Sequence, residues 1–312
     1  MAGAIRVLGR PWSLALLLAL TLALGACGDP SSPEEPAPSE PTQAGGAFDG
    51  DRAYADVRAQ VELGPRPQGS RANARNARMI AAELRQAGVE EVEVSPAPLR
   101  NVVGVIPGTE DGFVVIGAHH DTKAGIPNFV GANDGGSGVA VVLELARVLA
   151  ADAPLEGPSL AIALFDGEEA RGSRAFSEDG KRGSRAYVDL ADRGGEGAVP
   201  ALEQIEAMVL FDMVGDCDLQ IPLEANSDEG LFSSFALADP GVFEGETAPI
   251  DDDHTPFLQA GVPAVDLIDF TYGGEETPGR FWHTPADTLE QVCAQSLDRV
   301  GEAAVLAVPR LP

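Results

Sequence analysis

The chain has 312 residues, with 49 Asp and Glu against 21 Lys and Arg, so its formal net charge is −28. This excess of acid argues against nucleic-acid binding, which needs clustered Lys and Arg, and against docking on an anionic lipid surface. Hydrophobic residues make up 44% of the chain, enough for a globular core. Three cysteines exclude a disulfide-dense scaffold.

The chain begins with a segment typical of an export signal. Arg6 and Arg10 are its only charged side chains, and they precede an apolar run over residues 14–24 that is short for a transmembrane helix. The run ends in Leu-Gly-Ala-Cys at residues 24–27, which resembles the bacterial lipoprotein signal, in which the Cys becomes the lipidated first residue. We therefore predict removal of residues 1–26 and a lipid on Cys27. The alternative is an ordinary signal peptide with a chance Cys.

Residues 28–47 are rich in Pro, Ser and Glu and have hardly any large apolar side chain. Such a segment cannot bury enough surface to fold, so it is predicted to be an extended tether. The chain is thus divided into a signal peptide (1–26), a lipidated Cys with its tether (27–47) and one folded domain (48–312). The protein is expected to be exported and attached to the bacterial cell envelope, facing the periplasm or the surface, through its lipid alone.

Cys217 and Cys293 remain as a pair inside the domain. An exported protein meets an oxidising compartment, where a disulfide between them can form and persist. The sequence gives no geometry for the pair, so a bridge and two separate thiols both stay open.

Helical and strand patterns alternate along the domain. The alternation indicates a single α/β domain with a central mixed, mostly parallel sheet covered by helices on both faces. Residues 171–197, rich in Gly, Arg and Ser, are predicted as loop around a short helix. Helices are predicted over 51–63, 70–87, 137–150, 231–237, 254–260 and 296–308. Strands are predicted over 92–94, 101–106, 113–118, 160–165, 208–213 and 264–268.

His, Asp and Glu residues recur just after the buried strands. Because ligand sites of open α/β sheets lie beyond the carboxyl ends of the strands, these side chains are expected to meet. Imidazole and carboxylate together are a ligand set of zinc. Each residue alone has a plainer explanation as a solvated loop, a charged turn, a helix cap or a packed His, but their recurrence favours a metal site. The residues are His119, His120, Asp121, Asp134, Glu168, Glu169, Asp212 and His283.

Six motifs occur in order along the domain: GAHHDT, GANDGGSGVAVVLELA, LFDGEEA, LFDMVGD, DDDHTPFLQAGVPAVDLI and WHTPADT. In this order they resemble the family of zinc aminopeptidases, co-catalytic zinc metallopeptidases that also include glutaminyl cyclase. The likeness spans the whole domain. It implies a zinc-exopeptidase-like fold with a mixed sheet of about eight strands covered by helices.

The resemblance also implies roles for individual residues. Glu168 matches the catalytic base, and Asp252 lies in DDDH, where the family has an Asp behind the metal ligands. An acidic helix N-terminus is the alternative explanation for Asp252. The implied ligands are His119, Asp134 and Asp212 for one zinc, and Asp134, Glu169 and His283 for a second.

Strand geometry supports part of this assignment. Alternate side chains of an extended segment share a face, so His119 and Asp121 point the same way and His120 points away, as a packed or rim residue. Asp121 can then accept the free imidazole N–H of a ligating His119. The adjacent Glu168 and Glu169 are not expected to share one orientation, so one can bind metal while the other transfers protons.

The implied reaction is hydrolysis of the peptide bond next to a free N-terminus. Two zinc ions would lower the pKa of a water between them, and Glu168 would take its proton and later protonate the leaving amine. We favour this aminopeptidase prediction, with peptide or protein N-termini as substrates. The oligomeric state stays open.

Two alternatives remain. A glutaminyl cyclase forms N-terminal pyroglutamate with one zinc; FVGA before Asn133 and the GSR at residues 183–185 favour it. An insert without Trp after DGEEA, and Asp266 where the cyclase has His, count against it. The third hypothesis is an inactive lipoprotein that only binds peptides, which the complete set of ligands disfavours.

Overall fold

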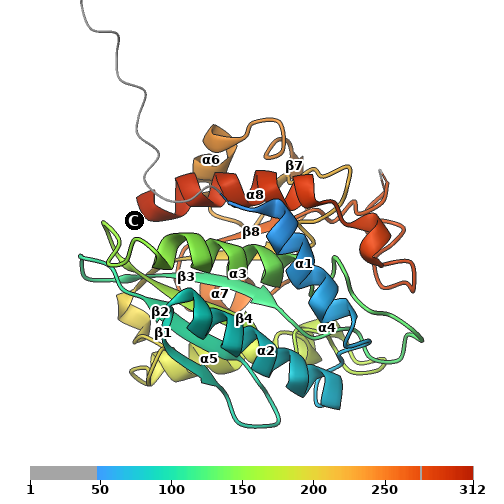
Figure 1. The fold of residues 1–312 in the computed structure, drawn as a ribbon, viewed down its shortest axis with the longest axis horizontal. Helices are drawn as coiled ribbons and strands as arrows, with labels where there is room; N and C mark the ends of the chain where they lie inside the picture. Colours follow the sequence, from blue (N-terminus) through green and yellow to red (C-terminus); the bar gives the residue numbers. More distant parts are fainter. Residues whose placement is uncertain (1–47, 275, 312) are drawn as a thin grey trace, which may run out of the picture. The chain divides into compact units, whose positions relative to one another are not determined.

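The computed structural model describes residues 48–274 and 276–311. The predicted signal peptide, Cys27 and the tether lie outside these residues, so their predictions stay untested. Within the described ranges no helix is both long and apolar enough to cross a membrane. These residues form one α/β domain in which helices cover both faces of a central sheet (Figure 1).

The central sheet has six strands in the order β1-β2-β4-β3-β5-β8. The pairs β3–β4, β3–β5 and β5–β8 are parallel, whereas β1–β2 and β2–β4 are antiparallel, so the mixed, mostly parallel sheet is confirmed. The strands are β1 (Glu90–Val94), β2 (Val102–Ile106), β3 (Phe113–His119), β4 (Ser159–Phe165), β5 (Ile205–Asp212) and β8 (Ala264–Ile268).

The expected count of about eight strands is corrected to six for this sheet. The other two strands of the described chain, β6 (Leu223–Glu224) and β7 (Glu246–Thr247), pair only with each other. Each has two residues, too short for the apolar runs that identify strands in a sequence. They lie in the long connection between β5 and β8, which therefore adds structure beside the sheet rather than to it.

Two apolar layers sandwich the sheet. Side chains alternate along the central strands, so Val114 and Ile116 of β3 face one layer while Val115 faces the other. Helices α1 (Gly50–Val61), α2 (Arg71–Ala87), α3 (Ser137–Ala150), α6 (Glu229–Ala238) and α8 (Ala294–Ala307) form the first layer. Helices α5 (Arg182–Asp192) and α7 (Thr255–Gln259) form the second.

Helix α3 packs directly on the middle of the sheet. Its residues are almost all buried, as its apolar sequence predicted. Gly138 permits this approach, because a Cβ at that position would collide with the carbonyl oxygen of Phe211 in β5. The start of α3, with Asp134 just before it, is thereby held beside the ends of β3 and β5.

The insert after β4 is more ordered than predicted. Residues 171–197 contain the short helix α4 (Phe176–Asp179) and the 11-residue helix α5, where loop around one short helix was expected. Helix α5 forms because Tyr187, Val188 and Ala191 fall on one face and bury themselves against the sheet. The Gly and Arg content of the segment hid this apolar stripe.

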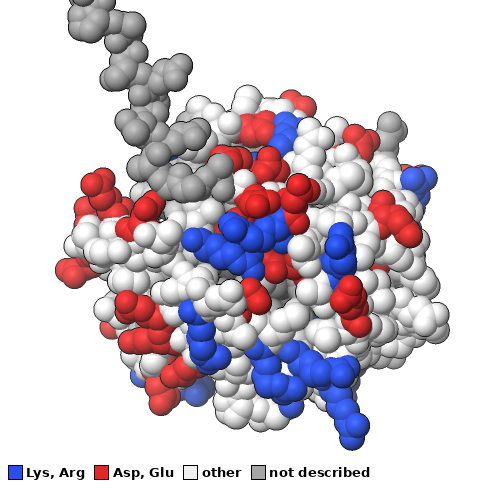
Figure 2. Space-filling model, in the orientation of Figure 1, with Lys and Arg blue, Asp and Glu red and all other residues white. Residues whose placement is uncertain are grey.

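Charged side chains are unevenly distributed on the face shown in Figure 2. Basic residues gather in the centre and lower part of the view, and acidic residues lie both among the central ones and along the outline. Arginines of α1 and α3 are paired with carboxylates: Arg52 contacts Glu144 at 2.5 Å, and Arg147 contacts Asp56 at 2.6 Å. These arginines therefore tie helices together instead of forming a bare cationic surface.

Candidate functional site

The parallel strands β3, β4 and β5 end at the same edge of the sheet. Side chains from this edge and from two loops meet there in two overlapping groups, whose candidate ligand atoms lie within 4.8 Å of one another. The strand-side group is His119, Asp134 and Asp212; the loop-side group is Asp134, Glu169 and His283. These are the two triads that the sequence predicted.

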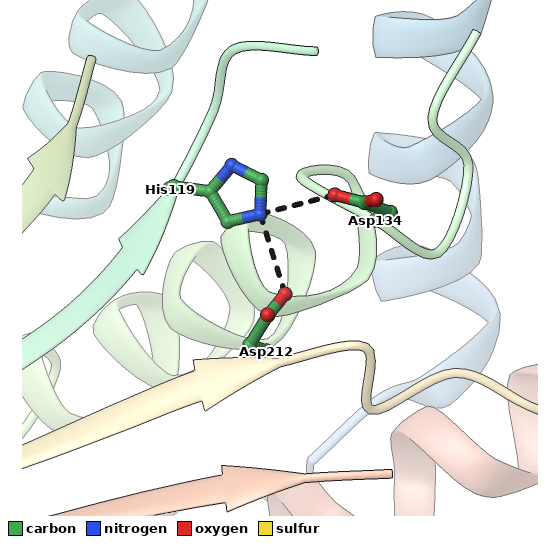
Figure 3. Close-up of side chains that lie close together, drawn as sticks. All are labelled: His119, Asp134 and Asp212. Carbon is green, nitrogen blue, oxygen red and sulfur yellow. Dashed lines mark ion pairs between the residues drawn. The ribbon is translucent and has the colours of Figure 1, made fainter. Parts of the chain in front are cut away.

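The strand-side group is built on the sheet. His119 is the last residue of β3 and Asp212 the last of β5, and His119 is only 2% exposed. His119 Nε2 lies 3.3 Å from Asp134 Oδ1 and 3.3 Å from Asp212 Oδ1 (Figure 3). Ligand atoms about 2.0–2.1 Å from a tetrahedral zinc are roughly 3.3 Å apart, so this spacing suits a metal.

The loop-side group depends on segments outside the sheet. Glu169 follows β4, and His283 stands in the loop after β8 with a backbone φ of 51°, in the left-handed region. His283 Nε2 lies 3.0 Å from Glu169 Oε1 and 3.5 Å from Asp134 Oδ2. The two oxygens of Asp134 thus face the two groups, as a bridging carboxylate requires.

The buried charge of the site is not balanced by the protein. Asp134 Oδ2 and Asp212 Oδ1 are buried and have no hydrogen-bond partner in the described part of the chain. Burial lowers the pKa of His119, but the carboxylates of Asp212, Asp121 and Asp134 outweigh burial and raise it well above its usual value. Unpaired buried carboxylates beside imidazoles fit a divalent cation.

Asp121 holds two functional segments together. Its Oδ1 lies 3.7 Å from His119 Nδ1, beyond a normal hydrogen bond but on the side of the ring that faces away from the metal group. The same oxygen accepts a hydrogen bond from the Glu168 backbone N–H at 3.0 Å, a contact that the sequence did not reveal. His120 points away as predicted: it is fully buried, and its Nε2 lies 3.0 Å from the Arg100 carbonyl oxygen.

Glu168 and Glu169 diverge, as expected of adjacent carboxylates with different tasks. Glu169 belongs to the loop-side group, whereas Glu168 belongs to neither group and lines the adjoining cavity. Burial and the neighbouring carboxylate of Glu169 raise the pKa of Glu168 well above its usual value. A carboxyl with a raised pKa can accept and return a proton near neutral pH.

Asp252 is a buried wall residue of the same cavity. Its carboxyl accepts the Asp253 N–H, and it precedes α7, so the acidic helix N-terminus expected as an alternative is also present. Burial and the charge of Asp266 raise the pKa of Asp252 well above its usual value. Asp252 is thus a buried acid that lines the same cavity as Glu168.

The sequence profile of peptidase family M28 matches residues 101–308. The chain belongs to peptidase family M28. Among solved structures, a glutaminyl cyclase from an Acidobacteriales bacterium is 31% identical, with a TM-score of 0.75, covering 90% of this chain and 99% of that one. A Zn-dependent exopeptidase from Parabacteroides distasonis is 26% identical, with a TM-score of 0.73, covering 84% of this chain and 98% of that one.

Curated relatives include the glutaminyl-peptide cyclotransferase of Boiga irregularis, which is 26% identical over 237 residues, 65% of this chain. The chain spans 62% of the length of that relative. Relatives of this M28 member thus include both cyclases and peptidases. Membership of the family therefore does not decide which reaction the site catalyses.

The cavity beside the two groups, about 370 Å³ in volume, has largely apolar and aromatic walls. Phe176 of the insert lines it, although the sequence offered no Trp at this place. Trp282 stacks on His283 with ring centroids 3.9 Å apart and packs edge-on against Phe270. The motif WHT pointed to Trp282, but no local pattern could have brought Phe176 to the cavity.

Two further contacts of this M28 site were missed from the sequence. Lys123 Nζ lies 3.1 Å from Glu169 Oε2, so an ammonium group already contacts the loop-side group. Behind the cavity, the fully buried His254 lies between Glu224, 3.3 Å from its Nε2, and Asp266, 3.8 Å from its Nδ1. Asp266, noted in the sequence for replacing a His, thus still neighbours an imidazole.

Cys217 and Cys293 are joined by a disulfide, with Cα atoms 4.9 Å apart, which resolves the alternatives that the sequence left open. The bridge fixes the loop after β5 to the start of α8, where the Cys293 N–H also donates to the Gly215 carbonyl. Asp216 in that loop accepts the Gly273 N–H at 2.7 Å. The disulfide therefore supports the segment that leads to His283.

Proposed function

We propose that this M28 enzyme is a zinc-dependent glutaminyl-peptide cyclotransferase that acts on peptide or protein N-termini. The observation that carries the proposal is Phe176, which supplies the aromatic wall whose absence made the sequence favour hydrolysis. Cyclisation needs the first side chain to fold back onto its own amine, away from competing water. A pocket with aromatic side chains in its wall, beside a proton carrier, supports that task.

The names of the relatives support the same choice. A structure that is 31% identical and covered over 99% of its length is named a glutaminyl cyclase, and so are similar structures from Porphyromonas gingivalis and Tannerella forsythia. The proposal reverses the order of preference drawn from the sequence, which placed hydrolysis first. It keeps the base, the ligands and the substrate class unchanged.

Zinc bound by the loop-side or strand-side residues would polarise the γ-carbonyl of the substrate's N-terminal Gln. Glu168 takes a proton from the substrate's α-amine, whose nitrogen forms a bond to the γ-amide carbon. Glu168 then returns the proton to the amide nitrogen, the carbon–nitrogen bond of the amide breaks, and ammonia leaves. The Asp121 hydrogen bond to the Glu168 N–H holds the base in place through both transfers.

Aminopeptidase hydrolysis is the second candidate. It is favoured by the completeness of both triads, with Asp134 oriented toward each. Two zinc ions would then be bound, and Glu168 would take its proton from water instead of from the substrate. A protein that merely binds peptides is not favoured, because every ligand and the base are present.

The deciding experiment incubates the full chain with a Gln-initiated peptide and a panel of aminoacyl reporters, and measures pyroglutamate, free amino acid and zinc content. A cyclase gives pyroglutamate and ammonia, with about one zinc per chain, and leaves the reporters intact. Release of the first residue from peptide and reporters, with about two zinc per chain, would establish the aminopeptidase instead.

We also propose that residues 1–26 are removed and that Cys27 carries a lipid that anchors the protein to the cell envelope. The support is the Leu-Gly-Ala-Cys ending and the tether-like composition that follows it. Cys27→Ser should release the protein from the membrane fraction. Equal membrane retention of the variant and the parent would contradict the anchor.

A further inference from the structure

One buried cation near the cavity has no part in the mechanism described above. The Lys181 side chain is only 2% exposed, and its Nζ lies 2.5 Å from Asp251 Oδ2. The same nitrogen lies 4.3 Å from the centre of the Phe176 ring, over its face. Burying an ammonium group is costly unless it is paired. The contacts with Asp251 and with the Phe176 ring offset this cost and hold the side chain in place.

The backbone of Lys181 is tied to the segment that carries the base. Its N–H donates to the Glu168 carbonyl at 2.8 Å, and the next N–H, that of Arg182, donates to the Gly167 carbonyl at 3.0 Å. Lys181 adopts a φ of 56°, in the left-handed region that a non-glycine residue seldom occupies. Such a conformation persists only where the surroundings impose it, and it is found most often at functional sites.

The partners of Lys181 lie on two different walls of the cavity. Phe176 belongs to the insert after β4, while Asp251 precedes the buried Asp252 in the segment before α7. The ammonium group therefore joins these two walls, and the Lys181 backbone attaches them to the Glu168 segment. Phe176 itself sits in a helix of four residues and is only half-buried, so its own packing holds the ring weakly.

The rest of the insert after β4 is held by contacts of Asp179, at the end of α4. Asp179 accepts hydrogen bonds from Arg171 and Arg174, and Arg182 also contacts it. These contacts order the loop but leave the Phe176 ring itself untouched. Among residues 48–274 and 276–311, Lys181 provides the one cation over that ring.

We propose that Lys181 is a positioning residue that sets the aromatic wall of the substrate pocket, and hence the fit of the substrate's first side chain. Its ammonium, held by Asp251, fixes the Phe176 ring over the cavity. This inference rests on the proposed function only in taking the cavity as the substrate pocket. Loss of the Lys181–Asp251 ion pair should weaken substrate binding more than it slows the chemical step. Neither Glu168 nor the metal groups would lose a contact with a reacting atom.

The test compares Lys181→Met, which keeps the apolar stem, with Asp251→Asn and with Asp251→Glu, which restores the charge. Phe176→Ala removes the wall itself, and Asp239→Asn breaks a remote ion pair, to Arg299 at 2.7 Å, as the matched control. Each variant is assayed for kcat and KM with glutamine 2-naphthylamide. Binding of 2-acetamidonaphthalene, which has no amine to react, is followed by quenching of Trp282, which lines the same cavity.

We expect Lys181→Met and Asp251→Asn each to raise KM and the probe's Kd about tenfold, between the effects of an exposed and of a desolvated cation–π contact, with kcat nearly unchanged. Asp251→Glu should recover most of the affinity, and Asp239→Asn should match the parent. Unchanged KM and Kd in both disrupted variants, even with a lowered Tm, would overturn the proposal.

The two proposals can fail separately. If the parent forms no pyroglutamate but the variants show the expected pattern of probe affinities, Lys181 keeps its role and the cyclase assignment falls. If pyroglutamate forms and the probe affinities of the variants do not differ from that of the parent, the cyclase assignment stands and the positioning role of Lys181 is rejected. Should Lys181→Met fail to fold, Asp251→Asn decides the question, because the Asp251 side chain is 43% exposed and its loss leaves no buried gap.

Discussion

The two halves of the site are held by different means. His119 and Asp212 end parallel strands, and the register of the sheet alone brings them together. His283 is 20% exposed, stands on a loop with a left-handed backbone, and relies on its stacking with Trp282 and on contact with Glu169. The sheet fixes His119 and Asp212, and Asp134 is shared by both groups, whereas Glu169 and His283 depend on contacts that a substitution can remove one at a time.

The halves also differ in their balance of charge. The strand-side imidazole is surrounded by Asp121, Asp134 and Asp212, so a protonated His119 can neutralise part of that group by itself. The loop-side group has Lys123 as an additional cation, and both groups border the cavity. Burial lowers the pKa of His283, but the carboxylates of Glu169 and Asp134 outweigh burial and raise it, so this imidazole too can carry a charge. If a single zinc is bound, we expect the loop-side group to hold it, because Glu169 of that group adjoins the base Glu168.

The largest expected effect is that of the base, which belongs to neither half. Glu168→Gln should lower turnover by about 10²–10⁴-fold, because the amide cannot take a proton, and zinc should stay bound. Glu169→Gln should lower turnover and also lose zinc, because it removes a charged ligand. Activity and zinc content of both variants check this, with Glu110→Gln as an exposed control. Full activity of Glu168→Gln, or equal loss of zinc from the two variants, contradicts the division of roles.

Removing one imidazole from each half tests the comparison directly. His283→Ala should lower zinc affinity by about 10²-fold or more, since a ligand bond is lost. His119→Ala should keep the zinc and lose activity. Zinc content after dialysis against a chelator series measures both. Loss of one zinc from each variant, starting from two, would mean that both halves are occupied and would favour the aminopeptidase.

Lys123→Met should tighten zinc binding about tenfold, because it removes a positive charge that contacts a loop-side carboxylate. Competition with a chelating dye measures the change, and Arg193→Met, far more exposed, serves as the control for lost charge. Unchanged affinity would show that the Lys123 ammonium moves away when the metal binds.

The metal-free protein should lose stability as pH rises from about 4 to 7. Burial raises the pKa of Asp253 and of Asp287 to about 7, so the folded state binds these protons more tightly than the unfolded state does. Their stabilisation is complete below the unfolded pKa near 3.8 and disappears as pH passes 7. Thermal unfolding with a chelator should show a Tm a few degrees lower at pH 8 than at pH 5.5. A higher Tm at pH 8 than at pH 5.5 would contradict the stabilising effect of protonated Asp253 and Asp287.

Much of the strand-side half could be predicted from the sequence. Continuous apolar runs identify β3 and β5, and alternation along an extended chain separates His119 and Asp121 from His120. The contacts of Lys123 with Glu169, of Phe176 with the cavity and of Asp121 with the Glu168 N–H could not be predicted, because they depend on how loops fold back over the edge. No periodicity encodes the path of a loop, and the same limit concealed helix α5 and the short pair β6–β7.

The disulfide between Cys217 and Cys293, which are 76 positions apart in the sequence, closes a ring of the chain. Asp252, Asp266 and His283 lie inside this ring, whereas His119, Asp134 and Glu168 lie outside it. Reduction of the disulfide would therefore free the ends of the segment that carries His283, while the pairing of β3 with β5 still holds His119 and Asp212. The loop-side half is thus the part of the site whose stability depends on an oxidising environment.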